Sequence, residues 1–144
     1  MAISYTNNWK NILDKLEGIL RDEFKGAMPV YTGANASVGN QFIRLIPTGS
    51  ELLEYGSSSE TRDFSIQILL YFLEANVKDK ALDHILRTIS RVEALIHDNM
   101  IITLDDATRA HSCRMQSVEL NIDEENDTPV ATWEFRCIHV GNIT

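Results

Sequence analysis

Apolar residues recur at steps of three and four along residues 7–25 and again along residues 79–98. This spacing gathers them on one side of a helix and leaves polar residues on the other. The first stripe is Trp9, Ile12, Leu13, Leu16, Ile19, Leu20 and Phe24, and the second is Leu82, Ile85, Leu86, Ile89, Val92 and Ile96. Asn7 or Asn8 can cap the first helix, and Gly26 suits the left-handed residue that ends it. The pattern predicts two amphipathic helices.

The middle of the chain shows strand signals. A short strand is expected at residues 29–31 and another at residues 41–47, where Pro47 ends it. Residues 48–60 are rich in Gly, Ser and Glu, which favours a loop, with strand ends at each side as the alternative. Residues 61–75 give the clearest strand, with one apolar face made of Phe64, Ile66, Ile68, Leu70 and Phe72.

That strand has two unusual properties. Beyond Gln67 its second face also becomes apolar, at Leu69, Tyr71 and Leu73, which predicts burial on both faces. Twelve residues of strand reach about 40 Å, which exceeds the common length of a strand. We therefore expect part of it to project past its own core.

A long hairpin closes the chain. The return strand alternates cleanly, with Ala131, Trp133, Phe135 and Cys137 on one face. The outgoing strand changes phase near Gln116 or Ser117, which predicts a β-bulge there.

The order of these elements predicts the fold class. Strands bunch between and after the helices and do not alternate with them as in βαβ units. This favours an α+β fold, with a largely antiparallel or mixed sheet, two main helices packed on one face and a long C-terminal β-hairpin. The length of 144 residues favours one domain over residues 1–144.

Charge narrows the functional classes. The formal net charge is -8, which argues against general affinity for nucleic acid or anionic membranes, although an acidic wall lets DNA pass without holding it. No apolar run reaches the roughly 20 residues of a membrane span, and the N-terminus shows no signal-peptide pattern. We expect a protein made in the cytoplasm.

No catalytic, cofactor-binding or metal-binding motif is present. The sequence has no phosphate loop, and no pair of histidines has metal-ligand spacing. Cys113 and Cys137 are expected to be buried thiols on the paired strands of the hairpin. A small enzyme using one of them with His111 or His139 is the weaker alternative, because no third orienting group is evident.

Charged residues outside the core are the remaining candidates for function. Asp105 and Asp106 are expected to cap a turn. Acids that could face a partner or a channel are Asp123, Glu124, Glu125 and Asp127 at the hairpin tip, with Glu51, Glu54 and Glu60 in the earlier loop. Arg87 and Arg91, one turn apart on the second helix, are candidate interface bases.

The order of elements resembles that of the tail terminator, or tail completion, proteins of tailed bacteriophages. The matching pieces are "NNWKNILDKLEGILRDEF", "NQFIRLIP", "TRDFSIQILLYF", "LDHILRTISRVEALIHDN" and "VELNIDEENDTPVATWEFRCIHV", which together cover nearly the whole chain. The likeness is one of pattern and carries no catalytic motif with it.

The resemblance implies a structural virion protein rather than an enzyme. Members of this family form a ring, commonly a hexamer, at the neck of the virion, where it caps the tail tube. The ring ends tube growth, meets the head–tail connector protein and lets DNA pass through its lumen, and in contractile tails it also contacts the sheath. Another neck component, such as a connector or stopper, is the nearest alternative.

Overall fold

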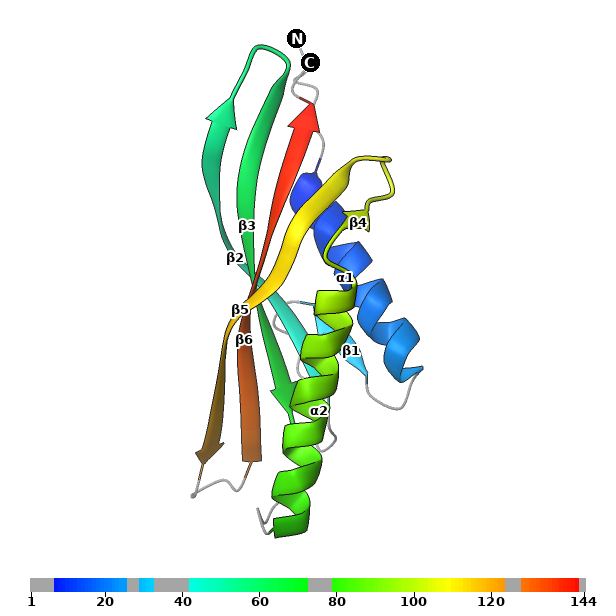
Figure 1. Cartoon of the computed structure of the whole chain (residues 1–144), viewed down its shortest axis with the longest axis vertical. Coiled ribbons are helices and arrows are strands. Elements are labelled where there is room, and N and C mark those ends of the chain that lie inside the picture. The colour runs from blue at the N-terminus through cyan, green and yellow to red at the C-terminus, as the bar shows by residue number, and fades with distance from the viewer. Residues whose placement is uncertain (1–6, 26–28, 33–41, 73–78, 124–127, 143–144) are drawn as a thin grey trace.

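The computed structural model describes residues 7–25, 29–32, 42–72, 79–123 and 128–142. Side chains are described for these residues except at 79–82, 122–123, 128–129 and 142. Helices α1 (Asn8–Phe24) and α2 (Asp79–Asp98) cover one face of a strongly twisted sheet (Figure 1). The strands are β1 (Val30–Thr32), β2 (Phe42–Tyr55), β3 (Ser59–Tyr71), β4 (Ile102–Thr103), β5 (Arg109–Asp123) and β6 (Thr128–Asn142).

The predicted fold class is confirmed. The six strands form one sheet in the order β1-β2-β3-β6-β5-β4, and every neighbouring pair is antiparallel except β1 and β2. The core lies between this sheet and the helices. Its largest fully buried side chains include Trp133 and Phe135 of β6, Ile66 and Ile68 of β3, and Leu16 of α1.

The helix boundaries follow local chemistry. The Asn7 side chain accepts a hydrogen bond from the backbone N–H of Lys10, which confirms the predicted cap. The residue in the left-handed conformation at the end of α1 is Lys25, with φ of 46°, and not Gly26 as predicted. Gly26 itself lies outside the described residues. On α2, Asn99 closes the last turn by donating from its side chain to the Leu95 carbonyl.

The predicted loop at residues 48–60 is wrong. Strand β2 continues through Pro47 to Tyr55, and β3 begins at Ser59, so that only a tight turn separates them. Register shifts between Pro47 and Gly49 and between Leu52 and Glu54 explain the difference, because a bulge absorbs a proline or a glycine without ending a strand.

Other predictions about burial had mixed outcomes. The predicted apolar face from Phe64 in β3 to Phe72 just after it is buried as expected. Leu69 and Tyr71 on the second face are only partly buried, because no helix covers that face, and Leu73 lies outside the described residues. Leu86 is exposed because it lies about 100° round α2 from buried Ile85. The predicted bulge in β5 is confirmed by a register shift between Met115 and Ser117.

The β2–β3 hairpin extends beyond the helices. In Figure 1 its turn lies past the first turn of α1, and no helix lies over it. Residues 50–58 are all exposed, which contrasts with the buried start of the same strand at Phe42, Ile43 and Leu45. The exposed projecting segment is thus residues 50–58 and not the strand at residues 61–75 for which projection was expected, because residues 61–72 are buried or half-buried.

Candidate interaction surfaces

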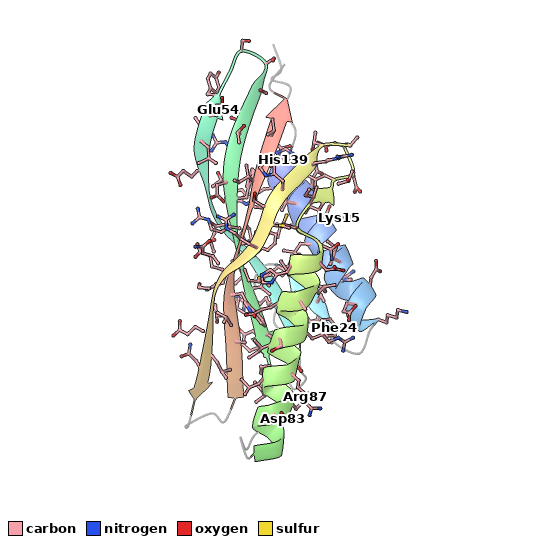
Figure 2. All side chains as sticks on the ribbon, viewed as in Figure 1. Lys15, Phe24, Glu54, Asp83, Arg87 and His139 are labelled. Carbon is pink, nitrogen blue, oxygen red and sulfur yellow. The ribbon has the colours of Figure 1, made fainter. Side chains whose placement is uncertain are left out.

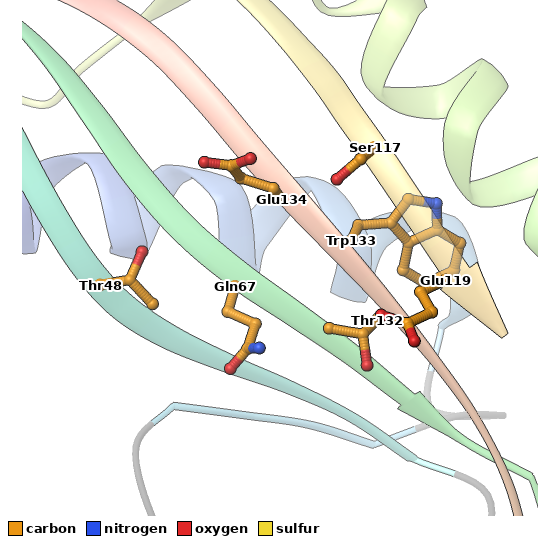
Figure 3. A pocket seen from close by; sticks show the side chains of 7 residues that line it. All are labelled: Thr48, Gln67, Ser117, Glu119, Thr132, Trp133 and Glu134. Atoms are coloured by element: carbon orange, nitrogen blue, oxygen red, sulfur yellow. The ribbon is translucent and has the colours of Figure 1, made fainter. Parts of the chain in front are cut away.

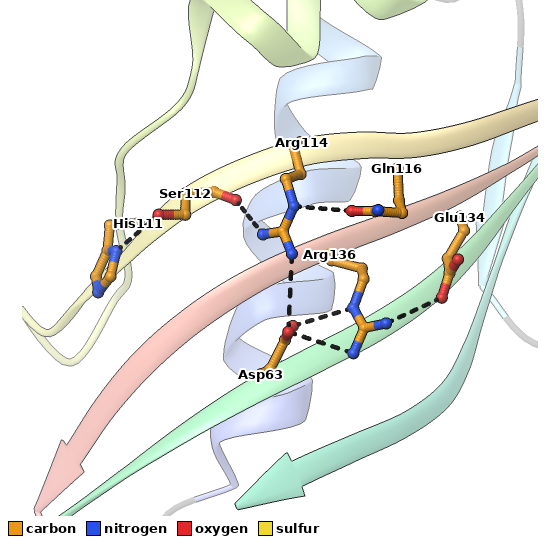
Figure 4. Close-up of polar contacts among 7 residues, drawn as sticks. All are labelled: Asp63, His111, Ser112, Arg114, Gln116, Glu134 and Arg136. Carbon is orange, nitrogen blue, oxygen red and sulfur yellow. Dashed lines mark hydrogen bonds and ion pairs between the residues drawn. The ribbon is translucent and has the colours of Figure 1, made fainter. Parts of the chain in front are cut away.

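The uncovered face of the sheet carries an ion cluster centred on Asp63 of β3 (Figure 4). Arg136 of β6 donates from Nε to Asp63 Oδ1 at 3.3 Å, and its Nη2 lies 3.2 Å from Oδ2. Arg114 of β5 approaches the same carboxylate from the other side, at 3.8 Å. Glu134 lies 3.5 Å from Arg136 Nη1. One carboxylate thus links three neighbouring strands, β3, β6 and β5.

The electrostatics of this cluster are internally balanced. The Asp63 residue is only 8% exposed, and such a carboxylate needs its charge matched. The hydrogen bond with Asp63 raises the pKa of the Arg136 guanidinium above its usual value. Because both arginines are held by Asp63, they are poorly placed to bind phosphate.

A shallow hollow lies beside this cluster on the same face (Figure 3). Its lining residues are Thr48, Gln67, Ser117, Glu119, Thr132, Trp133 and Glu134. Two of these are carboxylates, and none is a base. The hollow therefore has a net negative lining, which suits neither phosphate nor a nucleobase stack.

The projecting hairpin carries the most exposed apolar group on a strand. We define the hairpin end as residues 51–55 of β2. Within it, Leu52, Leu53 and Tyr55 are 46%, 49% and 69% exposed. Large apolar side chains scattered singly are ordinary, but three within four residues on an edge strand indicate a contact surface.

A second exposed apolar group lies on the opposite edge of the sheet. Met100 and Ile101, between α2 and β4, are 58% and 63% exposed. Arg109 pairs with Thr103 across β4 and β5, and it is exposed without a salt bridge to any described residue. We define the β4 edge as Met100, Ile101, Thr103 and Arg109.

The acids singled out by sequence divide into three groups. Glu51 and Glu54 are exposed on the hairpin end and have no salt bridge within the described part of the chain. Glu60 is instead tied to Arg62 at 3.3 Å. Asp123 ends β5, whereas Glu124, Glu125 and Asp127 lie outside the described residues. A role for these acids at an interface or a lumen stays a prediction.

The two candidate bases on α2 both have partners within the chain. Arg87 pairs with Asp83 one turn before it, and both side chains are exposed near the far end of the molecule from Glu54 (Figure 2). Arg91 contacts Glu23 of α1 at 2.9 Å and lies over the Phe24 ring, 4.8 Å from its centroid. Arg91 therefore joins α1 to α2.

The cysteines and histidines do not form a nucleophilic pair. Both thiols are free and buried, as predicted, and contact each other. A hydrogen bond with Cys113, together with burial, raises the pKa of the Cys137 thiol. Of the two histidines considered as bases, His111 contacts Ser112 and His139 contacts Thr108.

Sequence reasoning missed a series of hydrogen bonds that runs from buried His139 through Thr108 to exposed Asp106. This histidine is 1% exposed, and its Nε2 lies 2.8 Å from the Thr108 hydroxyl. The hydroxyl donates its one proton to Asp106, so it accepts from His139. Burial lowers the pKa of His139, and the hydrogen bond from Thr108 lowers the pKa of Asp106. Asp106 also accepts from the Thr108 backbone N–H, which confirms the predicted turn cap.

The sequence signal for these hydrogen bonds was the position of His139 in the alternating pattern of β6. It shares the phase of Ala131, Trp133, Phe135 and Cys137, and that phase faces the helices. Gly141 continues it, and a Cβ there would lie 3.0 Å from the Asn8 side chain. The start of α1 thus packs closely against the end of β6.

Within the described ranges, no three His, Cys, Asp or Glu side chains converge in a group that could hold a metal ion. No helix in that part of the chain is both long and apolar enough to span a membrane.

Comparisons with known proteins give a likeness of fold. No protein-family model matches the chain, and no curated protein matches its sequence. Among solved structures, it is similar to a chain in "Virion of native gene transfer agent (GTA) particle". The TM-score is 0.63 at 14% sequence identity, over 96% of this chain and 100% of that one. The whole of that virion chain and nearly all of this one therefore share an arrangement of helices and strands.

Proposed function

We propose that this protein is a structural component of a phage-like virion, and specifically a ring-forming tail terminator at the neck. Its action is geometric: a ring of copies caps the tail tube, stops further addition of tube subunits and offers a surface to the head–tail connector. No bond is made or broken. The enzyme alternative loses support because both thiols are buried and, among the described residues, no hydrogen bond joins either thiol to a histidine.

The observation that carries the proposal is the end-to-end likeness of fold to a chain of a virion particle. Fold alone does not specify function, so the surfaces must agree with it. The β2–β3 hairpin agrees with it, because it projects past the helices with apolar side chains that the described part of the chain leaves about half exposed or more. An assembly protein needs such surfaces, whereas an isolated monomer is made less soluble by them.

Charge agrees with the passage of DNA through the ring. A lumen that binds phosphate would hold DNA in place, because each cationic contact releases counterions and adds affinity. The net charge of -8 and the arginines neutralised by Asp63 work against such binding. Asp123 and the acids that follow it, up to Asp127, are the candidates for the lumen wall.

The test is a tube-capping assay. Purified protein is added to growing tail tubes of the cognate virion, and tube lengths are measured by electron microscopy. We expect shorter tubes with a ring at one end, in proportion to the protein added. Unchanged lengths and bare ends would contradict the terminator role. Binding to the head-side connector ring in that case would assign the protein to another part of the neck.

A further inference from the structure

We infer that the hairpin end of one copy docks on the β4 edge of the next copy, and that this contact closes the ring. The inference rests on the proposed function, to which it adds the interface. The occupant of each surface is a second copy of this chain. Leu52, Leu53 and Tyr55 pack on Met100 and Ile101, and the acids of the hairpin end face Arg109.

The two surfaces lie on opposite edges of one sheet and at the same level. The printed strand register gives a continuous rung across five strands: Leu52, Arg62, His139, Ala110 and Ile102. Leu52 is one end of this rung, and the other end is next to Ile101 and Thr103. A patch that meets a different patch on the next copy builds a ring when the rotation closes and a helical filament when it does not. The register places the two surfaces near the two ends of one rung, on opposite sides of the sheet, where two successive copies can bring them together.

The chemistry of the two surfaces is complementary. Each has large apolar side chains between about half and two-thirds exposed. The hairpin end adds two carboxylates, Glu51 and Glu54, and the β4 edge adds one guanidinium, Arg109. None of the three has a salt bridge to a described residue. Because β1 pairs with β2 only at residues 43–45, the hairpin end lies at an edge of the sheet, as β4 does, and side chains from both faces reach the boundary there. Opposite charges across an interface fix its register and suppress wrong partners.

The contact is made by side chains and not by adding strands edge to edge. The outer edge of β2 is interrupted by two bulges, one after Pro47 and one after Leu52, and β4 has only two residues. Bulges, prolines and charges are the features by which natural sheets block edge pairing. A second copy therefore meets a blunted edge with exposed side chains.

The test is a charge swap read out by native mass spectrometry of the full chain at a fixed concentration. Glu54→Arg and Arg109→Glu should each weaken assembly roughly tenfold or more, and the double variant should recover most of it. Lys15→Glu, which reverses an exposed charge on α1, is the matched control and should assemble as the parent does. Because all three positions are exposed, circular dichroism should show an unchanged fold.

Apolar substitutions test the same contact independently. The pair Leu52→Ser and Tyr55→Ser should reduce the assembled fraction, whereas Val118→Ser, at an equally exposed apolar position on β5, should not. Rings that survive both charge reversals and the serine pair would overturn this interface and leave the proposed function standing. A parent chain that never assembles, even on tail tubes, would overturn both.

Discussion

The two faces of the sheet are built on different principles. The face under the helices is an apolar layer in which Ile66, Ile68 and Trp133 are fully buried. The other face has no helix over it, and it is held by the carboxylate of Asp63 between Arg114 and Arg136. Each face is satisfied within one chain over the middle of the sheet. The hairpin end and the β4 edge, at the two sides of the sheet, are left exposed for contacts with other molecules.

The largest effect is expected on the covered face. Trp133→Ala should lower the free energy of unfolding by about 3–5 kcal/mol, because it leaves a cavity and removes the hydrogen bond from the indole Nε1 to Glu93. Chemical denaturation followed by circular dichroism measures the change. Val118→Ala, at an exposed position of β5, is the control and should change stability by less than about 0.5 kcal/mol. Equal losses at both positions would contradict the assignment of the core.

A smaller loss is expected at the centre of the uncovered face. Asp63→Asn removes the carboxylate that two arginines share and leaves Arg136 with Glu134 as its remaining salt-bridge partner, and it should cost about 1–3 kcal/mol. Added salt should reduce this loss, because screening weakens the repulsion between the two guanidiniums. The measurement is the denaturation midpoint of parent and variant at low and high salt. A loss that salt leaves unchanged would show that the cluster acts through packing.

The buried histidine predicts a pH dependence of stability. Burial lowers the pKa of His139 in the folded state below 6.5, so below that pH the unfolded chain binds more protons than the folded one. The contribution of His139 is therefore present above about pH 6.5 and is lost as the pH falls through the folded-state value. Asp106, whose pKa is lowered from 3.8, titrates in a separate window below about pH 4.

The measurement is thermal unfolding between pH 5 and pH 7.5. The parent should lose stability toward pH 5, and His139→Gln should flatten that slope while lowering stability at pH 7.5. His84→Gln, at an exposed position on α2, is the control. If the parent protein were equally stable at pH 5 and pH 7.5, the pH dependence assigned to buried His139 would be contradicted.

The smallest effects concern the two arginines on α2. Arg91→Gln removes the contact with Glu23 and the interaction with the Phe24 ring, and should cost about 0.5–1 kcal/mol. Arg87→Gln removes only an exposed pair one turn apart and should cost less than about 0.5 kcal/mol. Denaturation of the two variants side by side tests the order. Loss of assembly in the Arg87 variant would instead give this residue a role between copies.

What could be predicted from the sequence followed from periodicity. The helical stripes and the alternation in β3 and β6 identified the fold class, because one face of each element had to be apolar. The continuation of β2 past Pro47 was missed because local residue preferences favour a turn, whereas the pairing with β3 and two bulges override them. Predicting the ion cluster would have required the register of three strands, since Asp63, Arg114 and Arg136 are far apart along the chain.

The candidate surfaces show the same limit. The acids of the hairpin end were singled out from their charge alone, whereas the exposed leucines beside them were assigned to a loop. At the β4 edge the local pattern does not separate a strand from a packed loop, since Ile101, Ile102 and Leu104 fit either. That the two surfaces share one rung of the sheet depends on pairings of five strands, which no local pattern contains.

The central claim is that sister copies complete the sheet elements that one chain leaves uncovered. The most direct measurement is the mass of the purified chain in solution across a range of concentrations, by light scattering after size exclusion, together with images of the same sample. The account predicts a closed ring of about 98 kDa, which corresponds to six copies of the 16.3 kDa chain. A species that stays at 16.3 kDa at every concentration, with no ring on tail tubes, would contradict it.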